Sequence, residues 1–310
     1  MSTDTLVGET NGETPPAPPT ATSPIDTDGL VANHDEVERE RKIKRKLVRK
    51  KKASKRNLKC NPEKRTTEIT GDRNVKIDKD EVKLRINAAV VDLSLSEYFS
   101  EVLKTVKAAA EEVSLGALYC FGLGHFCESV TAKYQFAFLM ALKEALGILN
   151  SKTFVSDPIF YTDEEAILSE IYGLNVITEN LECFVPCQEP SLFILPHCPK
   201  QLTNNLLFSN WKPRLLENIL LISNSLTNIS ESVQSSNVKF INAVVEHKIF
   251  EEKKMRNSFK FSDIFNDLSL HTFKFQENID KNIWQMPRPV YDEADVEFIS
   301  KNIRGSIITT

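Results

Sequence analysis

Short apolar runs alternate with stretches of helical periodicity through the middle of this chain, and this alternation constrains the fold more than any other feature. The apolar runs suit strands that are buried on both faces of a sheet, and they lie at residues 117–121, 153–155, 175–178, 192–195 and 219–222. A strand, a helix and a second strand in succession form a right-handed βαβ unit. We therefore expect an α/β fold, a Rossmann-like open and mostly parallel sheet flanked by helices.

The helical stretches are marked by apolar residues at three- and four-residue steps and by end signals. Thr162 with Glu165 forms a predicted capping box that opens one helix, and Gly173 is placed to end it. The predicted helices lie at residues 95–113, 128–149, 162–171, 200–208, 211–217 and 236–255.

The chain is predicted to hold one domain behind a long N-terminal arm. The first 38 residues contain eight acids, five prolines and no Lys or Arg, a composition that is typical of disorder. Residues 57–94 are mixed and poorly periodic, which indicates a linker with an edge strand near residues 89–91. We expect the arm and linker at residues 1–94, the domain at 95–275 and a C-terminal tail at 276–310.

Residues 39–56 of the arm carry twelve Lys or Arg against one acid, Glu40. Because the formal net charge of the whole chain is −4, the remaining residues carry −15, so the basic character belongs to this segment. Dense positive charge without a fold suits an import receptor or the phosphates of a nucleic acid, while a simple solvated tail is the alternative. The residues that carry this prediction are Arg49, Lys50, Lys51, Lys52, Lys55 and Arg56.

The N-terminus lacks the basic and apolar regions of a secretory signal, and no window of eighteen residues is uninterruptedly apolar. We therefore expect a cytoplasmic and nuclear protein that has no membrane partner. In such a compartment cysteines stay reduced. The six that we expect as free thiols are Cys60, Cys120, Cys127, Cys183, Cys187 and Cys198.

Polar residues collect where the predicted strands end. In open α/β sheets ligands bind beyond the carboxyl ends of the strands, because loop amides and helix N-termini converge there. The candidate pocket for a small-molecule ligand therefore contains Gly122, Gly124, His125, Asp157, Glu179, Asn180, His197, Cys198, Asn224 and Ser225.

Two features of this pocket concern nucleotides. Gly122-Leu123-Gly124 stands where a phosphate-binding turn would lie, although the third glycine of the dinucleotide pattern is replaced by Cys127. Asp157 could receive a ribose hydroxyl. A nucleotide- or S-adenosylmethionine-dependent transferase is therefore one hypothesis, and a plain strand-to-helix turn is the alternative.

Other pairings concern His and Cys. His197 next to Cys198, or His125 reaching Cys198 from another strand end, suggests a base beside a thiol nucleophile. Cys198-Pro199 suggests thiolate ligation of haem. Cys183, Cys187, His197 and Cys198 are together four candidate zinc ligands, but their spacing fits no common site, so no metal site is predicted. The alternative for each is an ordinary packing or loop residue.

Several motifs along the chain are similar to those of one known family. They are 122–129 (GLGHFCES), Tyr134-Gln135, Asp157-Pro158-Ile159-Phe160, Glu179-Asn180, 195–199 (LPHCP), 204–207 (NNLL), Asn210-Trp211, Ser223-Asn224-Ser225 and 265–273 (FNDLSLHTF). In order and approximate spacing they resemble the sensitivity-to-red-light-reduced family. The resemblance spans residues 115–273 and departs from the usual pattern at His125, Thr203 and Ser223.

The resemblance implies a regulator. Members of the family act in circadian clock gene expression, in light signalling in plants, and in haem biosynthesis and proliferation in animals. Our first hypothesis is thus a regulatory protein whose pocket binds haem, a nucleotide or another small ligand. An enzyme of the transferase type and a pure interaction protein remain the alternatives.

Overall fold

The computed structural model describes residues 73–111, 114–232, 237–275, 279 and 281–291, all of which belong to the unit Thr67–Thr310. The predicted acidic and basic arm, with Arg49 and its basic neighbours, lies outside the described residues. So does Cys60, while the other five cysteines are free thiols as expected. No helix among the described residues is long and apolar enough to cross a membrane.

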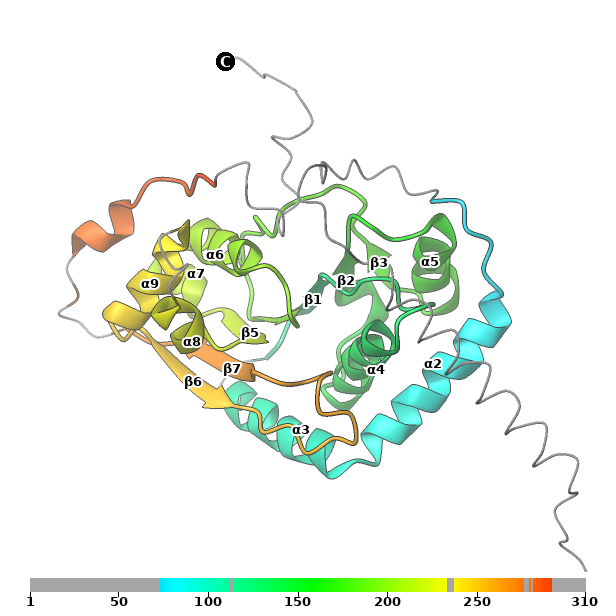
Figure 1. Ribbon diagram of the computed structural model, residues 1–310. Helices are drawn as coiled ribbons and strands as arrows, with labels where there is room; N and C mark the ends of the chain where they lie inside the picture. The colour runs from blue at the N-terminus through cyan, green and yellow to red at the C-terminus, as the bar shows by residue number, and fades with distance from the viewer. Residues whose placement is uncertain (1–72, 112–113, 233–236, 276–278, 280, 292–310) are drawn as a thin grey trace, which may run out of the picture. The chain divides into compact units, whose positions relative to one another are not determined.

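One sheet runs through the described residues, and its seven strands lie in the order β3-β2-β1-β4-β5-β7-β6 (Figure 1). The strands are β1 (Ala117–Phe121), β2 (Thr153–Ser156), β3 (Asn175–Val176), β4 (Ser191–Leu195), β5 (Ile219–Asn224), β6 (Phe250–Lys254) and β7 (Leu268–Phe273). The first five pair in parallel, and β7 is antiparallel to both β5 and β6. The predicted Rossmann-like, mostly parallel α/β fold is confirmed.

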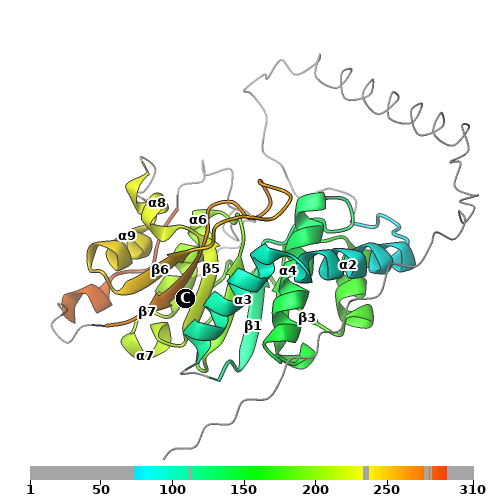
Figure 2. The same ribbon diagram turned by 90° about the horizontal axis from the view of Figure 1, so that it is seen from below.

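Helices cover the sheet on both faces. They are α2 (Lys79–Ser94), α3 (Glu97–Ala110), α4 (Val130–Ala145), α5 (Thr162–Ala166), α6 (Lys200–Ser209), α7 (Pro213–Leu216), α8 (Leu226–Glu231) and α9 (Lys239–Glu246), with the short helices η1 (Asn150–Lys152), η2 (Ile167–Ile171) and η4 (Lys281–Gln285). In Figure 2, α2, α3 and α4 lie apart from α6, α8 and α9. The helices therefore form two layers with the sheet between them.

Strand β4 shows why both layers form. All five of its residues are buried, and successive side chains of a strand point to opposite faces. Leu192 and Ile194 join the core under α2–α5, whereas Phe193 and Leu195 join the core under α6–α9. A continuous apolar strand thus anchors both helix layers, as parallel sheets require.

The segment before residue 95 is not a linker. Residues 79–94 form α2, which packs against α4 and buries Val82, Ile86, Ala89 and Leu93. The prediction of a linker with an edge strand was wrong because α2 also carries exposed apolar residues, Leu84 and Val91, which blur its buried stripe. A hydrogen bond of 2.6 Å from the Tyr134 hydroxyl to the Asp92 carboxylate ties α2 to α4.

The predicted closing helix at residues 236–255 is also wrong in its second half. Helix α9 ends at Glu246, Lys248 adopts a left-handed φ of 53°, and the chain continues as the edge strand β6. No glycine or proline marks this change in the sequence. Strand β7 was not predicted as a strand at all, although its motif had been noted.

The start of the expected C-terminal tail packs on the domain. Ile283 is buried, and its carbonyl accepts a hydrogen bond of 2.5 Å from the indole N–H of Trp211. The Tyr291 hydroxyl donates to the amide oxygen of Asn205 at 2.7 Å.

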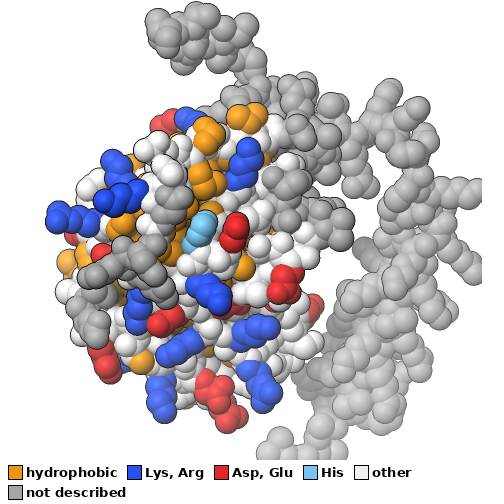
Figure 3. All heavy atoms as spheres, turned by 90° about the vertical axis from the view of Figure 1, so that its left-hand side faces the viewer, with side chains coloured by type: hydrophobic (Ala, Val, Ile, Leu, Met, Phe, Trp, Pro, Cys, Tyr) orange, Lys and Arg blue, Asp and Glu red, His pale blue; other side chains and the backbone are white. Residues whose placement is uncertain are grey.

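Figure 3 shows the side of the molecule on which α9 lies, where Lys and Arg side chains are interspersed with Asp and Glu.

A buried histidine on β7 joins this strand to β5 and to the start of α8. His271 on β7 is fully buried, its Nδ1–H donates to the carbonyl of Leu221 at 3.1 Å, and its Nε2 accepts from the backbone N–H of Leu226 at 3.4 Å. Burial lowers the pKa of His271 to about 4, although the nearby Glu252 carboxylate opposes the shift. The ring is therefore neutral in the folded protein.

This neutral ring predicts a loss of stability in acid. Below about pH 6.5 the unfolded chain binds a proton at His271 that the folded chain does not, so stability falls between about pH 6.5 and pH 4, by about 3 kcal/mol in total. His271→Gln can donate and accept but cannot titrate, so it should lack this part of the pH dependence. Urea unfolding of both proteins from pH 7 to pH 4 measures the difference, and parallel curves would contradict the prediction.

Candidate ligand-binding site

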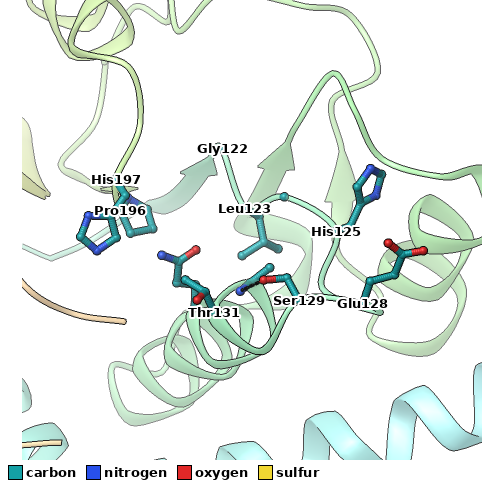
Figure 4. Close-up of a pocket in the computed structure, with 11 residues that line it drawn as sticks. Gly122, Leu123, His125, Glu128, Ser129, Thr131, Pro196 and His197 are labelled. Carbon is teal, nitrogen blue, oxygen red and sulfur yellow. Dashed lines mark hydrogen bonds between the residues drawn. The ribbon is translucent and has the colours of Figure 1, made fainter. Parts of the chain in front are cut away.

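A cavity of about 580 Å³ lies at the carboxyl ends of β1 and β4, next to the first turns of α4 (Figure 4). Pro196 and His197 stand on one side of it, and Ser129, the N-cap of α4, and Thr131, in its first turn, stand on the other. The lining residues are Gly122, Leu123, Gly124, His125, Glu128, Ser129, Thr131, Ala132, Gln135, Pro196 and His197. Four of the predicted pocket residues, Gly122, Gly124, His125 and His197, are thus brought together.

The glycine turn that follows β1 depends on the absence of side chains. Gly122 and Gly124 have φ angles of 69° and 72°, a left-handed conformation that suits glycine. A Cβ at Gly122 would collide with the sulfur of Cys198, which follows β4. The turn is therefore packed directly against the neighbouring strand end, and Gly122 cannot be replaced without moving it.

Asp157, which follows β2, holds this turn in place. One of its carboxylate oxygens accepts the N–H of Gly124 at 2.7 Å, and the other accepts the N–H of Ile159 at 3.0 Å. Burial raises the pKa of Asp157, against the two backbone hydrogen bonds that lower it. The carboxylate thus occupies the amide that a bound phosphate would use, and in this structure it serves the loop rather than a ribose.

Helix α4 enters the site with its N-terminus. The Ser129 hydroxyl accepts the N–H of Ala132 at 3.2 Å, as an N-cap residue does. Thr131 and Gln135 lie four residues apart, so they share one face of the helix, and both line the cavity. The buried side chains around them, Phe136 and Leu139 among others, fix the helix on the sheet.

His125 is oriented by a buried carboxylate. Its Nδ1 lies 2.9 Å from Oε2 of Glu164, a residue with no exposed surface, and its ring stacks on Tyr161 with centroids 3.9 Å apart. Glu164 also accepts the N–H groups of Cys127 and Tyr161, at 3.0 and 3.1 Å. Since a carboxylate oxygen accepts hydrogen bonds, Nδ1 of the imidazole donates to Glu164.

Glu164 is a residue that the sequence analysis missed. The predicted capping box used Thr162 and Glu165, whereas the helix begins one residue earlier, with Tyr161 as its N-cap, so that Glu164 faces back to the Tyr161 N–H. Because Glu164 and Glu165 are adjacent, the sequence alone does not show which of the two occupies the capping position. The α-helix ends at Ala166, and the chain continues as the π-helical η2.

His197 is held on the opposite side in a strained backbone conformation, with φ of 54°. Its N–H donates to Oδ1 of Asn224 at 3.0 Å, and its Nε2 lies 3.0 Å from the carbonyl of Ile264, to which it donates. Nδ1 lies 3.4 Å from the amide nitrogen of Asn224, which donates to it. Asn224 therefore joins the site as a support for His197.

Cys198 does not pair with a histidine. Its thiol donates to the carbonyl of Phe121 at 3.1 Å, and His125 is bound to Glu164 instead, so the hypothesised His125–Cys198 pair is not formed. Burial raises the pKa of the Cys198 thiol well above its usual range. A haem ligand needs the thiolate, which this environment opposes.

The remaining predicted residues lie away from the cavity lining. Asn180 accepts the N–H of Glu182 in the loop after β3, where Glu179 also lies, and the Ser225 hydroxyl caps α8 by accepting the N–H of Asn228. Among the described residues no group of three or more His, Cys, Asp or Glu could hold a metal ion. The four candidate zinc ligands therefore do not converge.

The lining residues that were not predicted come mostly from α4 and the two residues before it. The candidates were predicted at strand ends and not at helix starts. The lining residues missed for this reason are Glu128, Ser129, Thr131, Ala132 and Gln135. A usable signal was present. Gln135 interrupts an apolar stretch of the helix (YQFAFLMAL, 134–142), which is an unusual place for a polar side chain.

Comparisons with known proteins agree with the resemblance to the sensitivity-to-red-light-reduced family. Residues 95–272 match the model of the SRR1 domain. The chain is 29% identical over 225 residues to the SRR1-like protein of Drosophila melanogaster, covering 71% of this chain and 79% of that protein. It is 30% identical over 187 residues to the SRR1-like protein of Mus musculus, covering 50% and 75%. It is 24% identical over 163 residues to Protein SENSITIVITY TO RED LIGHT REDUCED 1 of Arabidopsis thaliana, covering 49% and 58%.

Two solved structures are distantly similar. The 23S rRNA methyltransferase ErmE is 13% identical with a TM-score of 0.32, covering 63% of this chain and 72% of that one. Human N-acetylserotonin methyltransferase in complex with SAM is 12% identical with the same TM-score, covering 64% and 57%. At these values neither similarity carries an argument about this chain.

The role of Asp157 in holding the glycine turn is testable by its removal. Asp157→Ala leaves the N–H groups of Gly124 and Ile159 without their acceptor, so we expect the free energy of unfolding to fall by about 2 kcal/mol. Urea unfolding at pH 7 measures it. Asp263→Ala, at an exposed position, is the matched control and should cost less than about 0.5 kcal/mol. Equal effects of the two substitutions would show that Asp157 does not hold the turn.

Proposed function

This chain belongs to the SRR1 domain family, and we propose that it is a regulatory protein that binds a small molecule at the carboxyl end of its sheet. Its proposed biological role, taken from the family, is in circadian clock gene expression and in haem biosynthesis. Binding of a metabolite in the cavity would make that regulation depend on the concentration of the metabolite.

The position of the cavity is the observation that carries the proposal. The strand order reverses between β1 and β4, since β2 and β3 follow on one side of β1 and β5 follows on the far side of β4. In open α/β sheets ligands bind at this reversal, outside the carboxyl ends of the strands. The cavity lies there, between the Gly122 turn after β1 and Pro196 after β4. Its volume lies in the range that small-molecule sites occupy.

The side chains around the cavity are fixed before any ligand arrives. His125 is held by Glu164 and Tyr161, His197 by Asn224 and Ile264, and the turn by Asp157. Pre-organised groups lose little conformational entropy on binding, so they favour recognition. This arrangement supports a binding site more than an incidental surface hollow.

An enzyme is the second candidate, and His125 is the observation that favours it. His125 lines the cavity, and the Glu164 carboxylate lies 2.9 Å from its Nδ1, which is how a carboxylate orients the imidazole of a general base. A nucleotide- or S-adenosylmethionine-dependent transferase would use such a base to remove a proton from the accepting atom. Turnover of a bound ligand, lost in His125→Gln while binding remains, distinguishes this candidate from a pure sensor.

Blocking the cavity tests the proposed binding. Thr131 is half-buried at the cavity wall, so Thr131→Trp should fill the cavity without disturbing the core. In a thermal-shift screen of nucleosides, nucleotides, S-adenosylmethionine and haem, a ligand at about 100 times its Kd stabilises by about 2.7 kcal/mol. We expect at least one to stabilise the native protein and none to stabilise the Trp variant.

Glu144→Trp, an exposed position at the other end of the same helix, is the matched control and should keep the shift. In cells that depend on this chain, Thr131→Trp should impair rhythmic gene expression or haem content while Glu144→Trp does not. A screen in which nothing stabilises the native protein would contradict the binding function.

The basic segment at residues 39–56 is proposed to direct nuclear entry or to contact nucleic acid. Replacing Arg49, Lys50, Lys51, Lys52, Lys55 and Arg56 by Gln should abolish nuclear accumulation of a fluorescent fusion, because an import receptor needs the dense charge. Replacing six lysines of the described domain, such as Lys104 and Lys107 on α3, by Gln is the control. Unchanged localisation of the first variant would contradict this part of the proposal.

A further inference from the structure

Gln135 is a polar side chain that the fold itself does not use. It is 5% exposed on α4 and lines the cavity, and none of the described residues hydrogen-bonds its side-chain amide. Its amide atoms are not fully closed off from solvent, and the residue lines the cavity. The exposed part of Gln135 therefore faces the cavity. The cavity therefore contains one donor and one acceptor that await a partner.

Such a side chain is costly at this position. Nearly buried polar groups are hydrogen-bonded in native proteins, since the loss of hydration is otherwise not offset. The neighbours Phe136, Ala137 and Leu139 are apolar and completely buried, so an apolar side chain would suit the helix at position 135. A ligand that pairs with the amide would remove the cost.

The electrostatics of the lining indicate which ligands fit. No Lys or Arg is among the described lining residues, while Glu128 is one of them. The carboxylates of Asp157 and Glu164 lie directly behind the lining, bound to Gly124 and to His125. These three acids, with no Lys or Arg among the described lining residues, oppose the approach of a phosphate.

Two of the backbone groups that could offset this charge are already engaged. The N–H of Gly124 is bound to Asp157, and the N–H of Ala132 in the first turn of α4 is bound to Ser129. Backbone amides of a glycine turn and a helix N-terminus are what phosphate-binding Rossmann folds use. The cavity thus has the position of such a site, but two of the donors that a phosphate would use are bound to side chains of the protein.

We infer that the cavity takes an unphosphorylated ligand, uncharged or cationic, whose paired hydrogen-bond donor and acceptor, as on the edge of a nucleobase or a carboxamide, bind the Gln135 amide. Glutamine makes such a two-point pairing with an adenine edge. The ligand class depends on the proposed function, because both concern the same cavity. Gln135 is then the residue that determines specificity.

Matched probes that differ in phosphate test the inference. Adenosine, AMP and ATP form one series, and nicotinamide and NAD form a second, with S-adenosylmethionine as a cationic probe. Isothermal titration at 150 mM salt should show that at least one unphosphorylated probe binds, and binds at least tenfold more tightly than its phosphorylated counterpart. Gln135→Met, which is similar in size and cannot form the pair, should bind that probe at least tenfold more weakly.

The stability of the ligand-free protein separates recognition from a structural role. Because Gln135 has no hydrogen-bond partner among the described residues, Gln135→Met should melt at the native temperature or above it, and Glu144→Gln on the same helix should change neither melting nor binding. Gln135→Glu keeps the size but cannot donate, so it provides the binding comparison if the Met variant fails to fold. A lower melting temperature for both variants of Gln135 would assign the residue to the fold and overturn the inference.

The outcomes distinguish the ligand class from the binding function. A phosphorylated probe that binds as tightly as its unphosphorylated partner, or unchanged binding in Gln135→Met, overturns the inference and leaves the cavity as a ligand site. If no unphosphorylated probe binds but a ligand from the wider screen does and is blocked by Thr131→Trp, the inference also fails alone. If nothing binds at all, the proposed function fails, and the inference fails with it.

Discussion

The parallel pairing of β1 with β4 is the constraint on which the rest of the structure depends. Cys120 pairs with Ile194 near the carboxyl ends, so the two strands leave the sheet side by side. From there the chain runs to α4 in one helix layer and to α6 in the other. Two connections that part in opposite directions leave a space between them, and the cavity is that space.

The contact of Cys198 with Gly122 shows how tightly the two strand ends are joined. The sulfur occupies the space of a side chain at Gly122, and its proton goes to Phe121, the last residue of β1. The thiol of this half-buried cysteine therefore fills the space between the strand ends. Packing therefore accounts for the position of Cys198, the residue that the sequence had suggested as a nucleophile or a haem ligand.

The glycine turn illustrates why a fold does not by itself indicate a ligand. Its backbone conformation matches that of a phosphate-binding turn, yet Asp157 takes the amide and adds a negative charge. The same backbone thus supports the opposite electrostatic preference. The charges that face a site, and which donors are already engaged, decide its chemistry more than the shape of the loop does.

The sequence by itself determined the parallel half of the sheet, because strands buried on both faces are continuous apolar runs and their βαβ connections have one hand. It also indicated the strand ends where Gly122, His125 and His197 lie. Local patterns could not reveal α2, whose exposed Leu84 hides its buried stripe, or the edge strand β6, most of whose polar residues face water on the rim of the sheet.

Only the tertiary structure decided which polar groups have partners. The bonds of Glu164 to His125 and of Asp157 to Gly124 join residues 39 and 33 positions apart, and the isolation of Gln135 is a property of everything packed around it. A hydrogen bond depends on distances of a few tenths of an ångström between segments remote in the chain. Those distances are set by the packing of the whole domain, so no local pattern of residues could determine them.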